Sequence, residues 1–333
     1  MNELTETVGA LMRQGRGILA ADESNKTANK RFEAVGIEPT EENRRRYREL
    51  LLTTPGIEKY LSGVILYDET MRQATSDGTL FPQSLVSKDI IPGIKVDEGL
   101  EDFNDGGQVT KGLDGLDGRL KEYKSMGARF TKWRAVARVG DGYADPAIME
   151  NARRMAEYAR VSQENGFVPF VEPEVLIDGA HSAEDTEGAL IETVAIVFDA
   201  LKKEHIELPG VILKTAMAVS GKDAETRAEA GEVAERTVRA LKTAVPEEAG
   251  GVVFLSGGQA PDEATENFNA IARLEPHPWP ITFSFSRALQ EPVLDIWRGK
   301  DDKKDEAQAV FLMRLSLTVA ADAGRYSKDM EQL

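Results

Sequence analysis

The sequence predicts an α/β protein: a single-domain (β/α)8 TIM barrel with an N-terminal helix and a C-terminal helical segment. Eight short apolar runs of strand type recur along the chain, and helical patterns separate nearly all of them. The runs are continuously apolar, as parallel strands covered on both faces require. A length of 333 residues suits one such barrel. A doubly wound open sheet is the competing architecture, and the spacing of the runs leaves it open.

The predicted strands share this apolar character and their short length. They cover residues 17–22, 63–67, 93–96, 128–134, 167–174, 210–214, 252–256 and 281–287. The fifth strand contains Pro169 and Pro173, and proline normally confines a strand to a sheet edge because it has no N–H to donate. We keep this strand and expect a weakened ladder. No linker or internal repeat is visible, so residues 1–333 are predicted to form one domain.

Capping residues predict where the helices begin and end. A leading helix precedes the first strand, and Thr40 is expected to cap a charged helix. Asp145, followed by a proline, opens a helix that stops at Gly166, where glycine can adopt a left-handed conformation. Ser182 and the aspartate three residues later form a weak capping box. An amphipathic helix over residues 304–323 closes the fold.

Composition excludes several classes of function. The formal net charge is −16, with 57 acidic and 41 basic residues, which disfavours binding to nucleic acid or to an anionic membrane. The absence of cysteine excludes disulfides and thiol catalysis and fits a reducing cytoplasm. We see no signal peptide and no apolar segment of membrane-spanning length. The expectation is a cytoplasmic protein without nucleic-acid or membrane partners.

Neither a metal site nor a dinucleotide site is expected. The three histidines, His181, His205 and His277, do not share helical ligand spacing, so a histidine-based metal centre is disfavoured. The glycine series at positions 112, 115 and 118 lacks the GxGxxG spacing and does not directly follow a strand, which indicates a loop.

Ionisable and polar residues gather at the carboxyl ends of the predicted strands, which in a barrel surround one mouth. They are Asp22, Lys95, Lys132, Arg134, Glu172, Glu174, Lys214, Ser256 and Arg287. Side chains alternate along a strand, so Lys132 shares a face with Arg134, and Glu172 shares one with Glu174. Any one of these residues can be read as a solvated rim charge. Because so many of the predicted strands end in ionisable residues, the set as a whole indicates a functional site.

Lys214 ends a buried apolar strand, where an ammonium group is unfavourable. Burial, or a second cation such as Lys132 nearby, would lower the lysine pKa and favour a nucleophilic amine that can form a Schiff base. Carboxylates beside it could move the protons that imine formation requires. A strand-ending lysine alone is more often a solvated cap, so the rest of the cluster carries this interpretation.

Two features of the mouth suit phosphate groups. The stretch that begins with Ser256 and Gly257 leaves backbone N–H groups open before a helix. Arg287 and Lys95 could bind a second anion, and arginine favours bidentate geometry.

Several motifs, in this order, give the chain a specific resemblance to the class I (Schiff-base) fructose-1,6-bisphosphate aldolases, from about Gly15 to Tyr326. They are residues 17–24 (GILAADES), 40–45 (TEENRR), 93–97 (GIKVD), 132–134 (KWR), 171–174 (VEPE), 254–259 (FLSGGQ) and 287–289 (RAL). The resemblance implies a cytoplasmic glycolytic lyase. Such an enzyme reversibly cleaves fructose 1,6-bisphosphate to dihydroxyacetone phosphate and glyceraldehyde 3-phosphate.

By this resemblance, Lys214 forms the imine with the substrate ketone and Glu172 dehydrates the carbinolamine. Asp22 takes the C4 hydroxyl proton as the C3–C4 bond breaks, and Lys132 and Glu174 resemble supporting charges around the imine. Ser256, Gly257, Ser286 and Arg287 correspond to the C1-phosphate site. Lys95, Ser24, Lys30, Arg31 and Arg134 correspond to residues around the C6-phosphate. The resemblance implies sugar-phosphate ligands, a homo-oligomer, and no metal or nucleotide cofactor.

The chain departs from the family pattern in three places. Thr215 and Ala216 follow the imine lysine where the family usually has Pro-Asn, and Ser286 replaces a glycine before Arg287. The sequence stops at Leu333 without the terminal tyrosine of many members. These departures leave open the rate and the preference between fructose 1,6-bisphosphate and fructose 1-phosphate.

Two other functions remain open. A glycosidase could use Glu172 and Glu174 as its carboxylate pair, although the lysines are then unexplained. Alternatively, the barrel could bind sugar phosphates without catalysis if the departures at Thr215, Ala216 and Ser286 have ended turnover.

Overall fold

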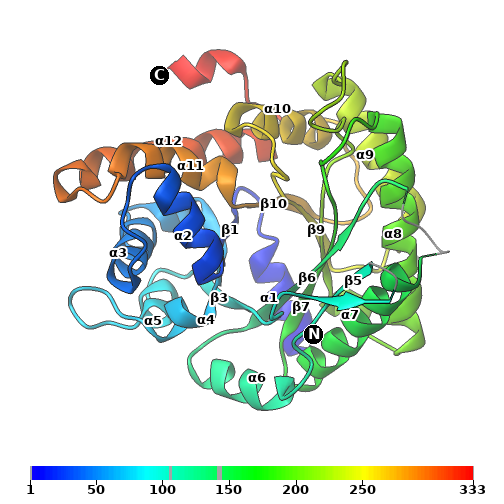
Figure 1. Ribbon diagram of the computed structural model, residues 1–333, viewed down its shortest axis with the longest axis horizontal. Helices are drawn as coiled ribbons and strands as arrows, with labels where there is room; N and C mark the ends of the chain where they lie inside the picture. The colour runs from blue at the N-terminus through cyan, green and yellow to red at the C-terminus, as the bar shows by residue number, and fades with distance from the viewer. Residues whose placement is uncertain (1, 105–106, 141–144, 333) are drawn as a thin grey trace.

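Eight parallel strands form a closed barrel at the centre of the molecule, and helices surround it (Figure 1). This computed structural model describes residues 2–104, 107–140 and 145–332. The order around the barrel is β1-β10-β9-β8-β7-β6-β3-β2. The strands are β1 (Gly17–Ala21), β2 (Leu61–Leu66), β3 (Ile91–Lys95), β6 (Phe130–Ala137), β7 (Val168–Val175), β8 (Ile212–Thr215), β9 (Gly251–Phe254) and β10 (Ile281–Phe285). The (β/α)8 prediction is therefore confirmed, and the open sheet is excluded.

Helices follow the strands and cover the outside of the barrel (Figure 1). They are α1 (Glu3–Leu11), α2 (Asn25–Ala34), α3 (Glu41–Leu52), α4 (Asp68–Arg72), α5 (Phe81–Val86), α6 (Leu116–Ser125), α7 (Pro146–Glu164), α8 (Ala183–Lys203), α9 (Ala230–Ala244), α10 (Pro261–Ala272), α11 (Arg287–Trp297) and α12 (Lys304–Asp322). Short 3₁₀ helices span Ile57–Lys59, Leu208–Gly210, Asp301–Lys303 and Lys328–Gln332. Among the described helices, none combines the length and apolar character needed to cross a membrane.

The predicted caps are present. The Thr40 hydroxyl accepts a hydrogen bond from the Asn43 N–H at 3.1 Å, and the Asp145 carboxylate accepts one from the Ala147 N–H at 2.7 Å. At the start of α8, Ser182 and its partner three residues on form the reciprocal capping box. Each cap satisfies a backbone N–H that the first helical turn cannot pair, so these three helix starts are fixed locally.

Two apolar cores hold the barrel together. One lies between the strands and the outer helices. The other fills the barrel interior and includes Phe130, Phe170 and Ile212, against which α1 packs Leu4 and Leu11. The N-terminal helix therefore closes the amino end of the barrel, and the carboxyl end is left for the site.

β7 pairs with β6 along eight residues, but with β8 only at Phe170 and Val171. The Val168 N–H donates towards β6, so by alternation Pro169 and Pro173 face β8. The two prolines, which have no N–H to donate, lie on either side of the short ladder between β7 and β8. The prolines thus occupy a strand in a closed barrel by shortening one of its two ladders.

The structure corrects three details. Residues 281–287 were predicted as one strand, but β10 ends at Phe285, because Ser286 leaves the extended conformation (φ −110°, ψ −81°) and Arg287 begins α11. Gly118 lies inside α6 rather than in a loop. An antiparallel pair, β4 (Leu100–Phe103) and β5 (Gly107–Thr110), lies outside the barrel and was not predicted. Met1 and Leu333, the limits of the predicted domain, lie outside the described residues.

Candidate active site

A pocket of about 1060 Å³ opens at the carboxyl ends of the barrel strands. It brings together all the site residues predicted from the sequence. They are Asp22, Ser24, Lys30, Arg31, Lys95, Lys132, Arg134, Glu172, Glu174, Lys214, Ser256, Gly257, Ser286 and Arg287. Because parallel strands deliver their carboxyl ends to one mouth, residues almost 270 positions apart in the chain line the same pocket.

The centre of the pocket is a buried chain of alternating charges. Lys214, Glu172 and Lys132 come from the adjacent strands β8, β7 and β6, and Asp22 follows β1 across the barrel. Lys214 Nζ lies 3.2 Å from Glu172 Oε1, and Lys132 Nζ lies 2.8 Å from Glu172 Oε2. Lys132 Nζ also donates to Asp22 Oδ2 at 2.8 Å. All four side chains are less than 10 % exposed.

The ammonium groups keep the buried carboxylates ionised. Burial raises the pKa of Glu172, but Lys132 and Lys214 outweigh it, so this pKa lies below its usual value. The same balance, again with Lys132 first and Lys214 second, lowers the pKa of Asp22. Burial lowers the pKa of Lys132, but Asp22 and Glu172 outweigh it, so this pKa is raised. Lys132 is therefore a fixed cation between two anions.

One end of the pocket has the features of an anion site. Gly257 and Gly258 follow β9 with positive φ angles of 53° and 86°, a conformation that can turn successive N–H groups towards one ligand. Arg287 opens α11, and the preceding Ser286 makes no side-chain hydrogen bond that caps this helix. The helix start and the arginine add two further attractions for negative charge.

At the other predicted anion site, cations are paired with carboxylates. Lys95 Nζ donates to the Asp97 carboxylate at 2.5 Å and to the Asp97 carbonyl at 2.6 Å. Arg134 pairs with Glu174. Glu174 was expected among the charges around the imine, and its ion-pair partner in the described part of the chain is Arg134. Its role beside Lys214 stays a prediction.

The remaining members of this second site stand near the rim. Arg31 pairs with Glu23, and Lys30 is exposed on α2. The Ser24 hydroxyl accepts a long hydrogen bond, 3.4 Å, from the Thr27 N–H and so caps α2. The Ser24 hydroxyl oxygen that caps α2 is therefore the same atom that is predicted to contact the phosphate.

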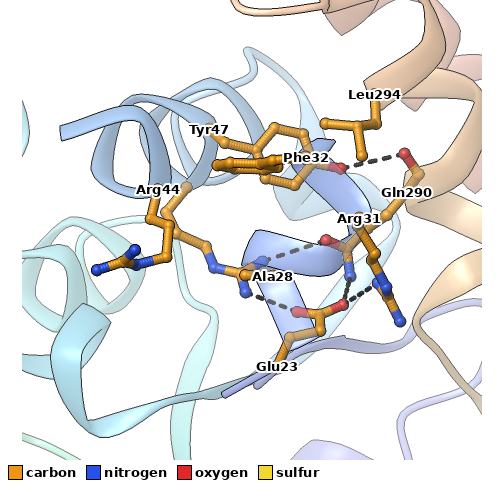
Figure 2. Close-up of a pocket in the computed structure, with 9 residues that line it drawn as sticks. Glu23, Ala28, Arg31, Phe32, Arg44, Tyr47, Gln290 and Leu294 are labelled. Atoms are coloured by element: carbon orange, nitrogen blue, oxygen red, sulfur yellow. Dashed lines mark hydrogen bonds and ion pairs between the residues drawn. The ribbon is translucent and has the colours of Figure 1, made fainter. Parts of the chain in front are cut away.

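Sequence reasoning missed a buried cluster beside the pocket, shown in Figure 2. Glu23 is its centre, with Arg48 from α3 and Gln290 from α11 as partners. The hollow in this view measures only about 10 Å³, room for at most one water, so it is not a ligand site. Glu23 directly follows Asp22 just beyond the end of β1 and also lines the large pocket, so its position beside Asp22 was the available signal.

The described residues contain no group of three or more His, Cys, Asp or Glu side chains with the geometry of a metal site. What they form is a barrel whose mouth carries a buried lysine, two carboxylates, a second lysine, and cationic ends. A buried lysine beside a carboxylate at the mouth of a barrel is an arrangement that suits enzymes acting on carbonyl compounds, and the cationic residues suit a substrate with anionic groups.

Comparisons with known proteins specify the family. The sequence model described as "Fructose-bisphosphate aldolase class-I" matches residues 3–333. The chain belongs to the class-I fructose-bisphosphate aldolase family.

Similar proteins span nearly the whole chain. The probable fructose-bisphosphate aldolase class 1 of Xanthomonas campestris pv. campestris is 48% identical over 312 residues, which cover 93% of each chain. The cytosolic fructose-bisphosphate aldolase 4 of Arabidopsis thaliana is 44% identical, over 99% of this chain and 85% of that one. Among solved structures, the fructose-bisphosphate aldolase from Plasmodium falciparum, in complex with TRAP and a small-molecule inhibitor, has a TM-score of 0.95. It is 44% identical, and the match covers 98% of this chain and 95% of that one.

Proposed function

We propose that this chain reversibly cleaves fructose 1,6-bisphosphate to dihydroxyacetone phosphate and glyceraldehyde 3-phosphate through a Schiff base on Lys214. The observation that carries the proposal is the position of Lys214, buried with its Nζ 3.2 Å from Glu172. The carboxylate of Glu172 is ionised and in contact with the amine, so it can receive the proton that the amine must lose before it attacks.

In the first half of the reaction, the Lys214 nitrogen bonds to the C2 ketone carbon, and the carbonyl oxygen takes up a second proton released by that nitrogen and becomes a hydroxyl. Glu172, now protonated, returns its proton to this hydroxyl, which leaves as water and forms the protonated imine. Lys132 stays charged because its pKa is raised, so it remains a fixed counter-ion to both carboxylates.

In the second half, Asp22 takes the C4 hydroxyl proton, and the C3–C4 bond breaks. Its electron pair moves into the imine and gives an enamine, while C4 becomes the aldehyde of glyceraldehyde 3-phosphate. Protonation at C3 and hydrolysis of the imine then release dihydroxyacetone phosphate and the free lysine. The protonated imine is the electron sink, so the proposal requires no metal.

We assign the substrate's two phosphates to two groups of residues that line the pocket. The C1-phosphate is placed at Ser256, Gly257, Ser286 and Arg287, where open backbone N–H groups and a helix start favour an anion. The C6-phosphate is placed at Lys95, Ser24, Lys30, Arg31 and Arg134. There it must share or replace the carboxylate partners of Lys95, Arg31 and Arg134.

A glycosidase fits the pocket less well. Its general acid needs a raised pKa, whereas the pKa of Glu172 is lowered and Glu174 is paired with Arg134. The non-catalytic barrel differs from the proposal only in turnover, so it is an outcome of the test below.

The test is a coupled assay for cleavage of fructose 1,6-bisphosphate, with and without EDTA, on the wild type and on Lys214→Met. We expect cleavage by the wild type that EDTA leaves unchanged, and at least a roughly thousandfold loss of kcat in the variant. Loss of activity in EDTA would contradict the metal-free reaction. Calorimetric binding of substrate without turnover would identify a non-catalytic barrel, and fructose 1-phosphate in the same assay measures the substrate preference.

We further propose a cytoplasmic homo-oligomer that binds sugar phosphates. The support is the family membership and the strongly acidic overall charge, which disfavours polyanionic partners. Sedimentation velocity over a range of protein concentrations measures the assembly state.

A further inference from the structure

The hydroxyl of Ser286 points into the Glu23 cluster rather than standing free in the pocket. Ser286 Oγ donates to Glu23 Oε1 at 2.7 Å. The same oxygen lies 3.2 Å from Gln290 Nε2 and 3.4 Å from Arg31 Nη1, both of which are donors. The half-buried hydroxyl thus has an acceptor for its proton and lies within reach of two donor groups.

Glu23 is the anion on which this cluster depends. Its Oε1 also accepts from Gln290 Nε2 at 2.9 Å and from Arg31 (Figure 2). Its Oε2 accepts from Arg48 Nη2 at 2.6 Å. The side chains of Glu23 and Arg48 are 6 % and 5 % exposed, whereas Arg31 is 24 % exposed and lines the pocket. A buried carboxylate therefore sets the position of a cation at the pocket edge.

Ser286 also stands at the start of α11. A serine at this position usually caps its helix by accepting from the second or third helical N–H. Here no such side-chain cap forms, since the hydroxyl is engaged by Glu23. The backbone of Ser286 has a negative φ of −110°, so this position does not require glycine.

We propose that Ser286 is a positioning residue, whose hydroxyl holds Glu23 so that Arg31 presents its guanidinium to the substrate's C6-phosphate. The proposal rests on the proposed function for the identity of the phosphate. It also gives the Ser286 side chain a defined role, because its hydroxyl links the start of α11 to Glu23 and Arg31. Ser286 then acts through two other side chains and touches no reacting atom.

The test compares Ser286→Ala with the wild type on two substrates. Loss of one hydrogen bond to a charged group predicts a KM for fructose 1,6-bisphosphate raised about three- to tenfold, with kcat within about twofold. Ser286→Ala removes the hydroxyl but keeps the backbone N–H that faces the C1-phosphate site. Fructose 1-phosphate lacks the C6-phosphate, so its KM should not change. Equal rises for both substrates, or no rise for either, would overturn the proposal.

A double-mutant cycle tests whether the effect passes through Arg31. In an Arg31→Ala background, Ser286→Ala should have no further effect on KM for the bisphosphate. Additive effects would show that Ser286 acts by another route and would contradict the proposal.

Thr282→Val serves as the matched control. It removes a hydroxyl from the opposite end of β10, where Thr282 Oγ1 donates to the Arg16 carbonyl at 3.0 Å, and it should leave both KM values unchanged. Thermal unfolding of each variant shows whether a change in KM comes from a loss of folded protein or from a displaced Arg31 side chain. If the wild type does not cleave the bisphosphate, the proposed function fails. Calorimetric affinities for fructose 1,6-bisphosphate in the same variants then still decide the role of Ser286.

Discussion

At the scale of single residues, the site depends on one carboxylate between two lysine side chains. Glu172 contacts Lys214 through one oxygen and Lys132 through the other. Their positions at the carboxyl ends of predicted barrel strands indicated that these side chains enter one mouth, and they do. The ion pairs within the mouth were not predictable, because the sequence does not show which of the nearby cations Glu174 would contact. It pairs with Arg134, a contact set by side-chain packing rather than by spacing.

Lys132→Met tests the electrostatic part of this arrangement. Without the ammonium group, the pKa values of Asp22 and Glu172 should rise, because burial then opposes their ionisation with only Lys214 left at the centre. We expect kcat/KM to fall about 10²- to 10⁴-fold and the acidic limb of its pH profile to move to higher pH. Lys132→Arg is the charge-preserving comparison. An acidic limb at the same pH in wild type and Lys132→Met would show that Lys132 does not control these carboxylates.

At the scale of elements, apolar runs sufficed to find all eight barrel strands, because a strand covered on both faces has no polar side to blur the pattern. The ends of the observed strands differ from the predicted ends by a few residues, because a strand end is fixed by contacts with residues distant in the sequence. The β4–β5 pair was missed because its strands have only four residues each and neither carries an apolar run. β4 is largely exposed, and β5 contains a single large apolar residue, Val109. The sequence also did not indicate which residues of neighbouring strands pack closely against each other.

Gly93→Ala tests one such close contact between β3 and β6. A Cβ at Gly93 would lie 2.3 Å from Cζ of the Phe130 ring, deep in the barrel interior. Overpacking should lower the free energy of unfolding by about 1–3 kcal/mol in denaturant titrations. Gly118→Ala is the matched control. Nothing lies within 4 Å of its Cβ, and α6 should gain about 0.5–1 kcal/mol. Equal stability of wild type and Gly93→Ala would show that the ring moves aside freely.

At the scale of the whole molecule, segments from opposite ends of the chain meet below the barrel. The Asp322 carboxylate at the end of α12 accepts the Gly15 N–H at 3.2 Å, just before β1 begins. Its other oxygen is buried and has no hydrogen-bond partner among the described residues. Burial raises the pKa of Asp322 to about 6 from its usual 3.8. No sequence pattern indicates this contact, because the two segments are some 300 residues apart.

The raised pKa predicts the sign of a stability change. Between about pH 4 and 6 the folded state keeps a proton on Asp322 that the unfolded state has lost, so this group favours folding as the pH falls. Asp322→Asn should therefore be more stable than the wild type at pH 7–8, by roughly 1–3 kcal/mol, with the difference vanishing towards pH 4. Urea titrations at several pH values measure it, with the exposed Asp295→Asn as control. A difference that is constant with pH would contradict the assignment.

Trapping of the imine decides whether Lys214 is the nucleophile. The protein is incubated with dihydroxyacetone phosphate, reduced with borohydride, and analysed by intact mass and peptide mapping. We expect one covalent adduct per chain on the peptide that contains Lys214, and none in Lys214→Met. An adduct on another lysine, or no adduct in a preparation that cleaves fructose 1,6-bisphosphate, would contradict the Schiff-base mechanism at Lys214.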